Sequence, residues 1–546
     1  MHRSAHVDTF CRDHLPPPEQ QPEFVFDLPE LHYPDRLNCA EVLLDGAIRR
    51  FGADRPCLRT AEETWTYGEL AARSNRIAHV LVDDLGLRPG NRVMLRGPNN
   101  PWTVAAWLAV VKAGGVAVTV MPLLRAKEIA ELVALTATGL VLTDHRFAGD
   151  LPEGVPSVRY GGSGVDDLVA RCAAKPDTFA SVDTASDDVV LLAPTSGTTG
   201  RPKATMHYHR DVLACADTFA RHVLRPEPDD VFTGTPPIGF TFGLGGLVVF
   251  PMRFGASTFL VERATPEELA DVVARHGVTV LFTAPTAYKA MLAAGRAADL
   301  AGLRRCVSAG EHLPPSTWEH FHRETGVRII NGIGGTELLH IFISAADDEI
   351  RPGATGKAVP GFRAAVLDAD GNPAPDGVPG RLAVKGPTGC RYLADARQLD
   401  YVHDGWNLTG DTYVRDADGY FWFQARDDDM IISSGYNIAG PEVEAALLDH
   451  PDVAETAVVG APDPDRGAIA HAFVVLRSGA SADPAKAAEL QAFVKSVIAP
   501  YKYPRRIEFV AELPRTPSGK VQRFKLRAEV RERAQHEVTP GDALIP

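Results

Sequence analysis

Short apolar runs alternate with helical patterns over most of this chain of 546 residues. Alternation of this kind is typical of βαβ units built on largely parallel sheets. We therefore expect an α/β protein whose large N-terminal part consists of stacked α/β sheets. The clearest predicted strands are Val93–Leu95, Val116–Val120, Gly139–Thr143, Ser257–Val261 and Thr279–Thr283, and the helices between them are Trp102–Ala113, Ala126–Thr136 and Pro266–His276.

The pattern changes twice towards the C-terminus. Phe362–Val384 holds short strands separated by Gly and Pro turns, which favours a small antiparallel or β-barrel-like module. A last unit begins near Asp428 and predicts an α+β domain. We place the boundary between 1–427 and 428–546 and expect the ends, 1–25 and 535–546, to be poorly ordered. The elements predicted in the last unit are helices Pro441–His450 and Pro484–Ile498 and strands Glu455–Val459, Ala470–Leu476 and Arg506–Val510.

Composition excludes several classes of protein. The net charge of −14 argues against binding to a nucleic-acid backbone as the main function. The seven cysteines form no CxxC pair, so zinc-binding and thioredoxin-like readings have no support, and we expect reduced thiols in the cytoplasm. The apolar run Leu108–Leu124 is interrupted by Lys112 and two glycines, which favours a buried strand over a membrane span. We expect neither a nucleic-acid nor a membrane partner.

The segment Val189–Lys203 is the most informative in the chain. An apolar run leads into Thr, Ser and Gly residues and ends at a lysine: Thr195, Ser196, Gly197, Thr198, Thr199, Gly200, Arg201, Pro202, Lys203. Glycines let backbone N–H groups converge into a nest for anions, while hydroxyls and the lysine add donors and charge. The loop suits a polyphosphate, although a flexible Ser/Gly turn is an equal reading. The spacing is not GxxxxGK(S/T), and the chain has neither GxGxxG after a strand nor GxSxG, so P-loop, dinucleotide-binding and α/β-hydrolase readings are disfavoured.

A second Gly-rich turn, Gly332–Glu337, closes on a hydroxyl and a carboxylate. Glu337 could hold Mg²⁺ against phosphate oxygens while Thr336 donates to a phosphate. The alternative is a glycine turn that caps a helix, with Thr336 as the N-cap residue.

Further polar segments are weak when taken singly. Trp406–Asp411 ends in a carboxylate that could accept both hydroxyls of a ribose, or it is simply a turn. Arg426–Asp429 places three acids before the apolar Met430–Gly435, which is also the composition of a solvated bend. Pro514–Lys520 is a Pro/Gly-bounded loop that presents one lysine, and most loop lysines only contact solvent.

Together, these segments resemble the adenylate-forming superfamily of acyl-CoA synthetases, adenylation domains and luciferases. The resemblance rests on TSGTTGRPK, GGTE, TGD, the Arg–Asp–Asp–Asp–Met–Ile run with GYNI and EVE, and PRTPSGK, in that order. It covers the chain from about Asn38 to about Arg527. The implied enzyme is an AMP-forming acid–thiol ligase that uses ATP, Mg²⁺ and coenzyme A.

The resemblance implies a role for each segment. Thr195–Lys203 would grip the β- and γ-phosphates, Thr336 would contact the α-phosphate, and Glu337 would bind Mg²⁺. Lys520 would bridge the acid's carboxylate and the α-phosphate, which offsets charge that develops during adenylation. The remaining nucleotide and cofactor contacts would come from Gly310, Glu311, Gly332, Ile333, Asp411 and Arg426, the last two at the ribose hydroxyls, and from Gly435 at the pantetheine arm.

The resemblance also implies a domain rotation between two half-reactions. Asp428 would be the hinge, and the small domain would withdraw Lys520 and bring the Gly435 loop to the thiol of coenzyme A. Three departures from the family pattern stand out: Ile432 replaces a lysine, Ala425 replaces a glycine, and Ile333 replaces an aromatic residue at the adenine.

The Gly-Ile-Gly-Gly-Thr-Glu turn with its His340 continuation is most similar to benzoate– and 2-aminobenzoate–CoA ligases. Thr241 stands where amino-acid-activating relatives carry an aspartate, so we expect an aryl acid, with 2-aminobenzoate first and His340 or Thr241 facing an ortho substituent. A packed core histidine is an equal reading of His340. The implied lining of the acid pocket is Phe240, Thr241, Phe242, Gly243, Ser308, Ala309, Gly310, Ile333, Gly334 and His340.

Other functions stay open at this point. They are a medium-chain acyl-CoA synthetase, a stand-alone enzyme that loads an aryl acid onto a carrier protein, a luciferase-like oxygenase and a non-catalytic nucleotide-binding scaffold. The scaffold reading is disfavoured because Lys520 and Glu337 are both present. We expect a monomer or a homodimer.

Overall fold

The computed structural model describes residues 3–196, 202–426, 430–433, 436–463, 466–498, 500–516 and 519–537. The chain divides into two compact units, Met1–Ala364 with Ala383–Thr409 and Ala365–Leu382 with Gly410–Pro546. The boundary that the sequence predicts at residue 427 stays a prediction, because residues 427–429 lie outside the described ranges. No helix among the described residues is both long and apolar enough to cross a membrane.

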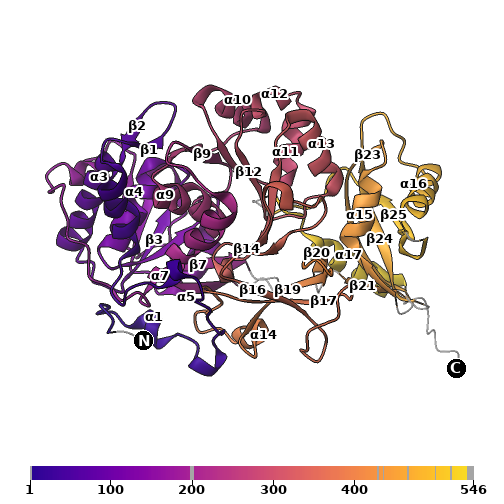
Figure 1. The fold of residues 1–546 in the computed structure, drawn as a ribbon, viewed down its shortest axis with the longest axis horizontal. Helices are drawn as coiled ribbons and strands as arrows, with labels where there is room; N and C mark the ends of the chain where they lie inside the picture. The colour runs from indigo at the N-terminus through magenta and orange to yellow at the C-terminus, as the bar shows by residue number, and fades with distance from the viewer. Residues whose placement is uncertain are drawn as a thin grey trace, which may run out of the picture. The chain divides into compact units, whose positions relative to one another are not determined.

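The first unit contains a nine-stranded sheet whose central strands are parallel (Figure 1). Antiparallel strands close both of its edges, with β14 and β15 at one end and β2 at the other. Carboxyl ends of parallel strands meet at one edge of a sheet, which is where ligands bind in α/β folds. In sheet order the strands are β15 (Lys357–Ala358), β14 (Ile341–Ser344), β13 (Ile329–Gly334), β12 (Arg305–Ser308), β11 (Val280–Thr283), β9 (Val231–Gly234), β10 (Ser257–Phe259), β1 (Pro56–Arg59) and β2 (Thr64–Thr66).

A six-stranded sheet forms the second layer of this unit. Its central strands β3, β4 and β5 are buried along their whole length, as expected for parallel strands covered on both faces. β8 runs antiparallel to β7 and makes the hairpin that bears the predicted phosphate loop. In sheet order the strands are β6 (Ser157–Tyr160), β5 (Leu140–Asp144), β3 (Arg92–Arg96), β4 (Val116–Val120), β7 (Val189–Ser196) and β8 (Pro202–Tyr208).

Helices of the first unit cover these sheets, and local sequence sets their ends. In α10 the Thr265 side chain accepts from the Glu268 N–H, the Glu268 side chain accepts in return, and Gly277 ends the helix at φ +64°. The predicted spans 126–136 and 266–276 are both confirmed. The helices are α1 (Phe10–Asp13), α2 (Gly46–Phe51), α3 (Tyr67–His79), α4 (Pro101–Lys112), α5 (Ala126–Thr136), α6 (Leu168–Cys172), α7 (His209–Cys215), α8 (Thr241–Leu244), α9 (Phe250–Phe254), α10 (Pro266–His276), α11 (Pro285–Ala293), α12 (Ala297–Leu300), α13 (Pro315–Thr325) and α14 (Gln398–Tyr401).

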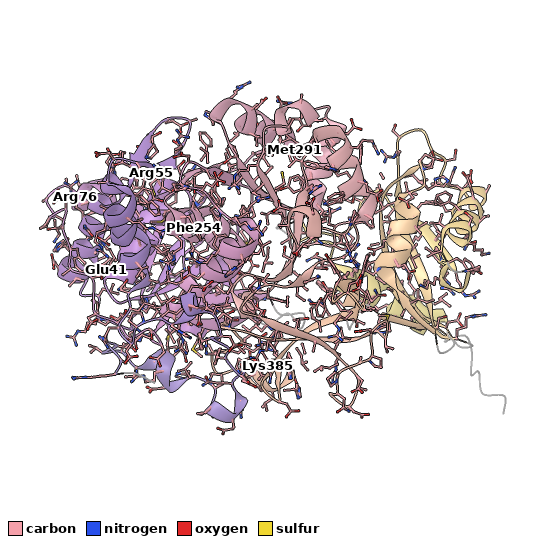
Figure 2. The ribbon with its side chains drawn as sticks, viewed as in Figure 1. Glu41, Arg55, Arg76, Phe254, Met291 and Lys385 are labelled. Carbon is pink, nitrogen blue, oxygen red and sulfur yellow. The ribbon has the colours of Figure 1, made fainter. Side chains whose placement is uncertain are left out.

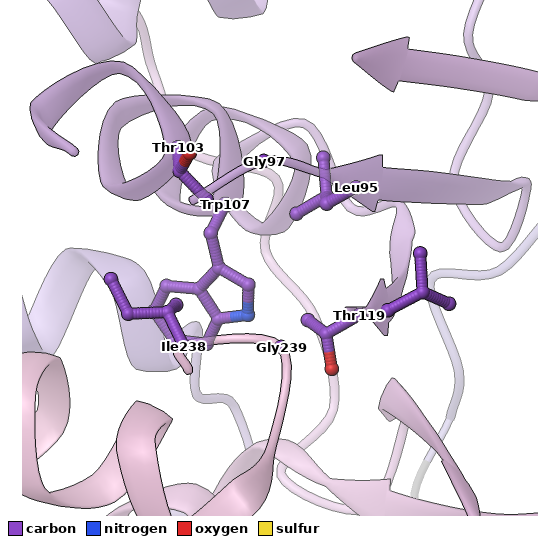
Figure 3. Close-up of a pocket in the computed structure, with 8 residues that line it drawn as sticks. Leu95, Gly97, Thr103, Trp107, Thr119, Ile238 and Gly239 are labelled. Atoms are coloured by element: carbon purple, nitrogen blue, oxygen red, sulfur yellow. The ribbon is translucent and has the colours of Figure 1, made fainter. Parts of the chain in front are cut away.

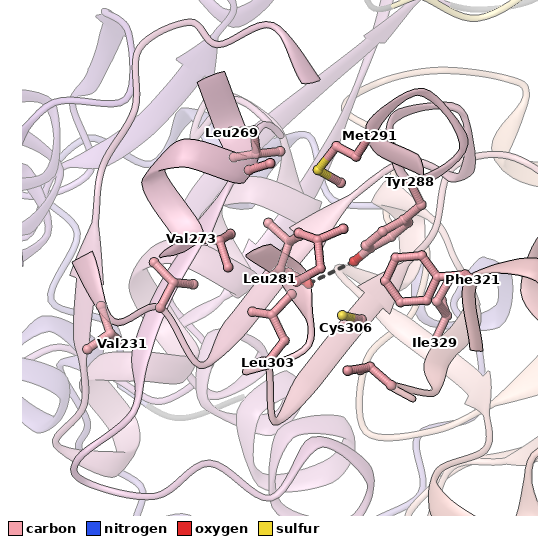
Figure 4. Packing of buried hydrophobic residues seen from close by; sticks show 14 of the residues in the cluster. Val231, Leu269, Val273, Leu281, Tyr288, Met291, Leu303, Cys306, Phe321 and Ile329 are labelled. Carbon is pink, nitrogen blue, oxygen red and sulfur yellow. Dashed lines mark hydrogen bonds between the residues drawn. The ribbon is translucent and has the colours of Figure 1, made fainter. Parts of the chain in front are cut away.

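A hydrophobic cluster joins α10, α11 and α13 to the nine-stranded sheet (Figure 4). Leu281, Met291 and Phe321 are fully buried in it, and Met291 is also labelled in Figure 2. The Tyr288 hydroxyl donates to the carbonyls of Leu281 at 3.1 Å and Val307 at 3.0 Å, so this buried phenol has its polar partners. The cluster includes Leu281 of β11 and Cys306 of β12, so it holds these two strands in place.

An antiparallel sheet has the strand order β16-β17-β19-β18, with β20 paired to β19. It matches the antiparallel module predicted from the Gly and Pro turns. Its strands are β16 (Arg363–Leu367), β17 (Gly380–Lys385), β18 (Val402–His403), β19 (Trp406–Arg415) and β20 (Phe421–Arg426).

The second unit has a core of its own on a further five-stranded sheet. β23 and β24 form a long antiparallel pair, so the predicted strands 455–459 and 470–476 are the middle and end of longer elements. The elements are β21 (Met430–Ser433), β22 (Tyr436–Ala439), α15 (Gly440–Leu448), β23 (Val453–Asp463), β24 (Gly467–Leu476), α16 (Pro484–Val497), β25 (Arg506–Phe509) and α17 (Arg523–Glu537).

The expectation of poor order was wrong for residues 3–25. The Ala5 N–H donates to Asp188 Oδ2 at 3.0 Å, and Asp8 pairs with Arg92, whose guanidinium lies 4.5 Å from the centre of the Phe10 ring. Further along, Glu23 pairs with Lys385 (Figure 2) at 2.5 Å. These contacts join residues far apart in sequence, so a polar, Pro-rich composition gave no sign of them.

Candidate active site

The predicted phosphate loop lies at the tip of the β7–β8 hairpin. Thr195 pairs with Lys203, so the strands bring the two ends of the loop together. Thr195 Oγ1 is buried and has no hydrogen-bond partner among the described residues. Gly197, Thr198, Thr199 and Gly200 lie outside those residues, and so does the side chain of Ser196.

Lys203 extends from β8 into a cluster with Glu337, Tyr392 and Tyr401. Its Nζ lies 3.1 Å from Glu337 Oε1, donates to the Tyr392 hydroxyl, and stands 4.0 Å and 5.8 Å from the centres of the Tyr392 and Tyr401 rings. The Tyr392 hydroxyl donates to Glu337 Oε1 at 2.5 Å. Burial and the neighbouring Glu337 carboxylate raise the pKa of Tyr392, which keeps the phenol protonated. An ammonium and a carboxylate thus share one phenol.

The second Gly-rich turn follows β13. Gly334 is a glycine by necessity, since a Cβ there would lie 2.7 Å from the His340 carbonyl oxygen. Thr336 opens a short 3₁₀ turn (Thr336–Leu338), and its carbonyl lies 2.8 Å from His207 Nε2. Burial lowers the pKa of His207 to about 4, so the ring is neutral near pH 7 and its Nε2–H donates to that carbonyl. The hydrogen bond from His207 of β8 therefore holds the start of this turn in place.

His340 lies in an aromatic cage, defined here as the rings of Phe219, Phe242, Phe250 and Phe282. The ring centres stand 5.6, 5.5, 4.5 and 6.4 Å from that of His340. Burial lowers the pKa of His340 to about 3, against an opposing effect from the Phe242 backbone. The cage holds an uncharged imidazole.

The predicted acid-pocket residues come from three neighbouring segments. Thr241 and Gly243 are buried in α8, Phe240 precedes that helix, and Ser308 is buried at the carboxyl end of β12 beside Asn331 of β13. Ser308 Oγ has no hydrogen-bond partner among the described residues. Ala309 is buried, Gly310 is exposed at φ +88°, Glu311 and Ile333 are half-buried, and Gly332 lies within β13.

A small cavity of about 10 Å³ lies next to this region. Ile238 and Gly239, which precede Phe240, line it together with Trp107 of α4 and Thr119 of β4 (Figure 3). The Trp107 indole N–H is buried without a partner among the described residues. The volume is about that of one water molecule, which would satisfy the indole.

Asp411 and Arg426 face each other in the second unit. They are register partners on β19 and β20, and Arg426 Nη1 lies 3.3 Å from Asp411 Oδ1. Asp411 is nearly buried, with 9% of its side chain exposed, while 46% of the Arg426 side chain is exposed. The pair combines an acceptor and a donor at one strand edge.

Lys520 occupies a tight loop of the second unit. The Thr516 N–H donates to the Lys520 carbonyl at 2.8 Å, and Thr516 Oγ1 accepts from the Lys520 N–H at 3.1 Å. Gly519 has φ +88°, a value that favours glycine. The Lys520 side chain is exposed, as the loop prediction implied. Asp428 and Gly435 lie outside the described residues, and so does the side chain of Ile432.

Sequence reasoning missed Tyr392, His207 and the buried pair of Arg391 and Asp211. The Arg391–Asp211 distance is 2.7 Å, and neither side chain is exposed. None of these residues belongs to a segment with an unusual composition. The available signal was the Arg-Tyr pair after the Gly-Pro-Thr-Gly turn, which carries no chemistry until the chain folds.

Comparison with known proteins places the chain in a family. The AMP-binding enzyme family matches residues 44–392, and the AMP-binding enzyme C-terminal domain matches residues 442–520. The benzoate–CoA ligase of Thauera aromatica is 36% identical over 517 residues, which cover 92% of this chain and 97% of that protein. The mitochondrial acyl-coenzyme A synthetase ACSM3 of Mus musculus is 33% identical and covers 85% of this chain and 84% of its own.

A solved structure agrees with these matches. The anthranilate CoA ligase AuaEII, solved in complex with anthranoyl-AMP, superposes with a TM-score of 0.87 and is 32% identical, with 93% of this chain and 100% of that chain covered. The matches define an AMP-forming acid–thiol ligase. The chain belongs to the AMP-binding enzyme family, and the resemblance inferred from its motifs is confirmed.

Proposed function

We propose that this ligase activates an aryl carboxylic acid, with 2-aminobenzoate first and benzoate second, and transfers it to coenzyme A. The observation that carries the choice of a ring is the aromatic cage around a neutral His340. Apolar walls with one uncharged polar group suit a flat ring that bears an amino or hydroxyl substituent. The names of the Thauera ligase and of AuaEII point to the same substrate class.

The first half-reaction forms an acyl-adenylate. A carboxylate oxygen of the acid attacks the α-phosphorus of ATP, and the bond to the pyrophosphate oxygen breaks. In this proposal the loop Thr195–Lys203 holds the β- and γ-phosphates and Thr336 donates to the α-phosphate. Lys520 holds the carboxylate against the α-phosphate, where a cation offsets charge that accumulates in the transition state.

Glu337 provides a suitable ligand for Mg²⁺. Its Oε1 is engaged by Lys203 and Tyr392, and 12% of the side chain is exposed. Mg²⁺ in nucleotide sites takes one or two carboxylates and completes its shell with phosphates and water. A bound Mg²⁺ would neutralise phosphate charge, and this chain's part is to hold Glu337 in place.

Further contacts to the nucleotide are assigned from the family pattern. Asp411 and Arg426 would hold the ribose hydroxyls, a role that suits their acceptor and donor groups. The base would be met by Gly310, Glu311, Gly332 and Ile333.

In the second half-reaction the small domain presents a different face to the active site. The proposed domains are 1–427 and 428–546, with Asp428 as their hinge. After adenylation the small domain turns, withdraws Lys520 and brings the Gly435 loop to the pantetheine arm. The thiolate attacks the carbonyl carbon of the mixed anhydride, the carbon–oxygen bond to AMP breaks, and the thioester and AMP leave.

The remaining parts of the proposal concern surroundings and partners. The partners are the acid, ATP and coenzyme A, and the enzyme is a monomer or a homodimer. All seven cysteines are free, which agrees with a cytoplasmic location.

The test is an acid panel assayed for AMP release with and without coenzyme A. The panel comprises benzoate, 2-aminobenzoate, salicylate and hexanoate. We expect the highest kcat/KM for 2-aminobenzoate or benzoate and multiple turnovers only with coenzyme A. The highest kcat/KM for hexanoate would instead identify a medium-chain acyl-CoA synthetase. Adenylate formation with transfer to a carrier protein but not to coenzyme A would identify a carrier-loading enzyme.

A further inference from the structure

Tyr392 is held in place by its neighbours on both sides. Residues 391–393 run along β8: the Met206 N–H donates to the Arg391 carbonyl at 2.7 Å, and the Leu393 N–H donates to the Ala204 carbonyl at 2.9 Å. The Tyr392 N–H donates to Gln398 Oε1 at 2.9 Å. Tyr392 therefore stands opposite Thr205, two residues from Lys203 on the same strand.

A buried ion pair anchors this segment. Arg391 Nη1 donates to Asp211 Oδ2 of α7 at 2.7 Å, and the Arg391 guanidinium lies 3.9 Å from the centre of the Tyr208 ring. Both charged side chains are fully buried. Separating such a pair leaves an uncompensated buried charge, so the segment resists displacement. The position of the Tyr392 phenol is therefore fixed by the fold rather than by solvent.

The phenol makes two hydrogen bonds of opposite sense. Its oxygen accepts from the Lys203 ammonium, and its single proton goes to Glu337 Oε1 at 2.5 Å. Lys203 and Glu337 also contact each other at 3.1 Å, so in this arrangement each neutralises the other. In the proposed function the Lys203 ammonium would contact the triphosphate, and the Glu337 carboxylate would bind the metal ion.

We propose that Tyr392 is a positioning residue that retains Glu337 for the metal ion when Lys203 turns to the triphosphate. The inference rests on the proposed function of this cluster as the ATP site. The phenol can lose the hydrogen bond from Lys203 without losing the one to Glu337, because the two use its lone pair and its proton respectively. The hydrogen bond from the Tyr392 hydroxyl then keeps the Glu337 carboxylate from moving with the Lys203 ammonium or turning to solvent.

The test is Tyr392→Phe, which deletes the hydroxyl and keeps the ring beneath Lys203. Binding of ATP is measured by calorimetry without acid, so no turnover occurs, once with Mg²⁺ and once with EDTA. A hydrogen bond to a charged group corresponds to roughly a ten- to hundredfold change in an equilibrium constant. We expect MgATP to bind weaker by roughly that factor and metal-free ATP by less than about threefold, because the hydroxyl acts through Glu337.

The matched control is Tyr288→Phe, which removes a buried phenolic hydroxyl from the hydrophobic cluster of Figure 4. It lowers the thermal midpoint and leaves the ratio of the two ATP affinities unchanged. A Glu337→Gln background gives a second check, because there Tyr392→Phe should have no further effect on MgATP affinity.

Two outcomes overturn the inference. Equal losses of affinity with Mg²⁺ and with EDTA would give Tyr392 a merely structural role, and an unchanged affinity for MgATP would give the hydroxyl no role at all. Neither bears on the proposed function, which fails separately if the wild-type chain releases no AMP with any acid of the panel.

Discussion

Gly245→Ala is the substitution that tests the aromatic cage most directly. Gly245 follows α8 with φ −62° and ψ −58°, helical values that any residue adopts. A Cβ at this position would lie 2.3 Å from Cδ2 and 2.8 Å from Nε2 of His340. The added methyl group therefore strikes the histidine ring and comes within 3.3 Å of Phe250 Cζ, while the backbone angles at this position need not change.

The magnitude follows from these distances. Non-bonded carbons rest about 3.5–4.0 Å apart, so the ring must retreat by about 1 Å or more. Phe250 is packed against the same ring, with its centre 4.5 Å from that of His340, so the movement disturbs a close contact. Overpacking costs about 1–3 kcal/mol, and replacing a helical glycine by alanine returns about 1 kcal/mol. The variant should fold with stability lowered by ~0–2 kcal/mol.

Catalysis should suffer more than stability. A displacement of about 1 Å near reacting groups can cost about a hundredfold in rate. We expect kcat/KM for the preferred aryl acid to fall by about ten- to a hundredfold. MgATP affinity should change by less than about threefold, because among the described residues the ring contacts of the cage do not include Lys203, Tyr392 or Glu337.

The assay is steady-state kinetics on the acid panel, with calorimetry for MgATP. Gly302→Ala is the control, because a Cβ at Gly302 meets nothing within 4 Å. If Gly245→Ala kept the wild-type kcat/KM for every acid while His340 had moved, the cage would not form the acid pocket. Equal losses for MgATP and acid would mean general disruption instead.

Three further outcomes are expected. Lys520→Ala should lower acid-dependent ATP–pyrophosphate exchange by about a hundredfold. It should affect thioester formation from supplied acyl-adenylate much less, and equal losses in the two reactions would contradict the domain rotation. The seven cysteines are all buried, and burial raises the pKa of each thiol. A thiol reagent should therefore label them slowly in the native protein and label all seven in urea, whereas rapid labelling of the native protein would contradict this packing. Burial lowers the pKa of His207 to about 4 and the pKa values of His209 and His340 to about 3. The stabilisation that these neutral rings give above pH ~6.5 should therefore be lost on acidification, by up to about 1.4 kcal/mol per pH unit for each, and the urea midpoint at pH 7, 6 and 5 measures the loss; a flat profile would contradict neutral histidines.

Sequence predicted the parts of the fold that depend on local pattern. The helix 126–136 and the strand 116–120 follow from periodicity and caps within a few residues, and the structure has both. Residues 3–25 are ordered through partners such as Asp188 and Arg92, far along the chain, and composition carries no such information. The same limit applies to Tyr392, whose role depends on pairing with β8, nearly two hundred residues earlier in the chain.

The protonation state of His340 shows why the substrate cannot be predicted from a sequence motif alone. A histidine after a Gly-rich turn can be charged or neutral, and burial within the fold, with four phenylalanine rings around the imidazole, makes the neutral form of His340 the stable one. A neutral imidazole can exchange a hydrogen bond with an amino or hydroxyl group, but it cannot balance a carboxylate. In the proposed function, the carboxylate of a benzoate-like acid bound beside the cage must therefore be met by a separate cation. In the proposed function that cation is Lys520, so we expect Lys520→Ala to be defective with every acid and cage variants to alter the order of preference among acids.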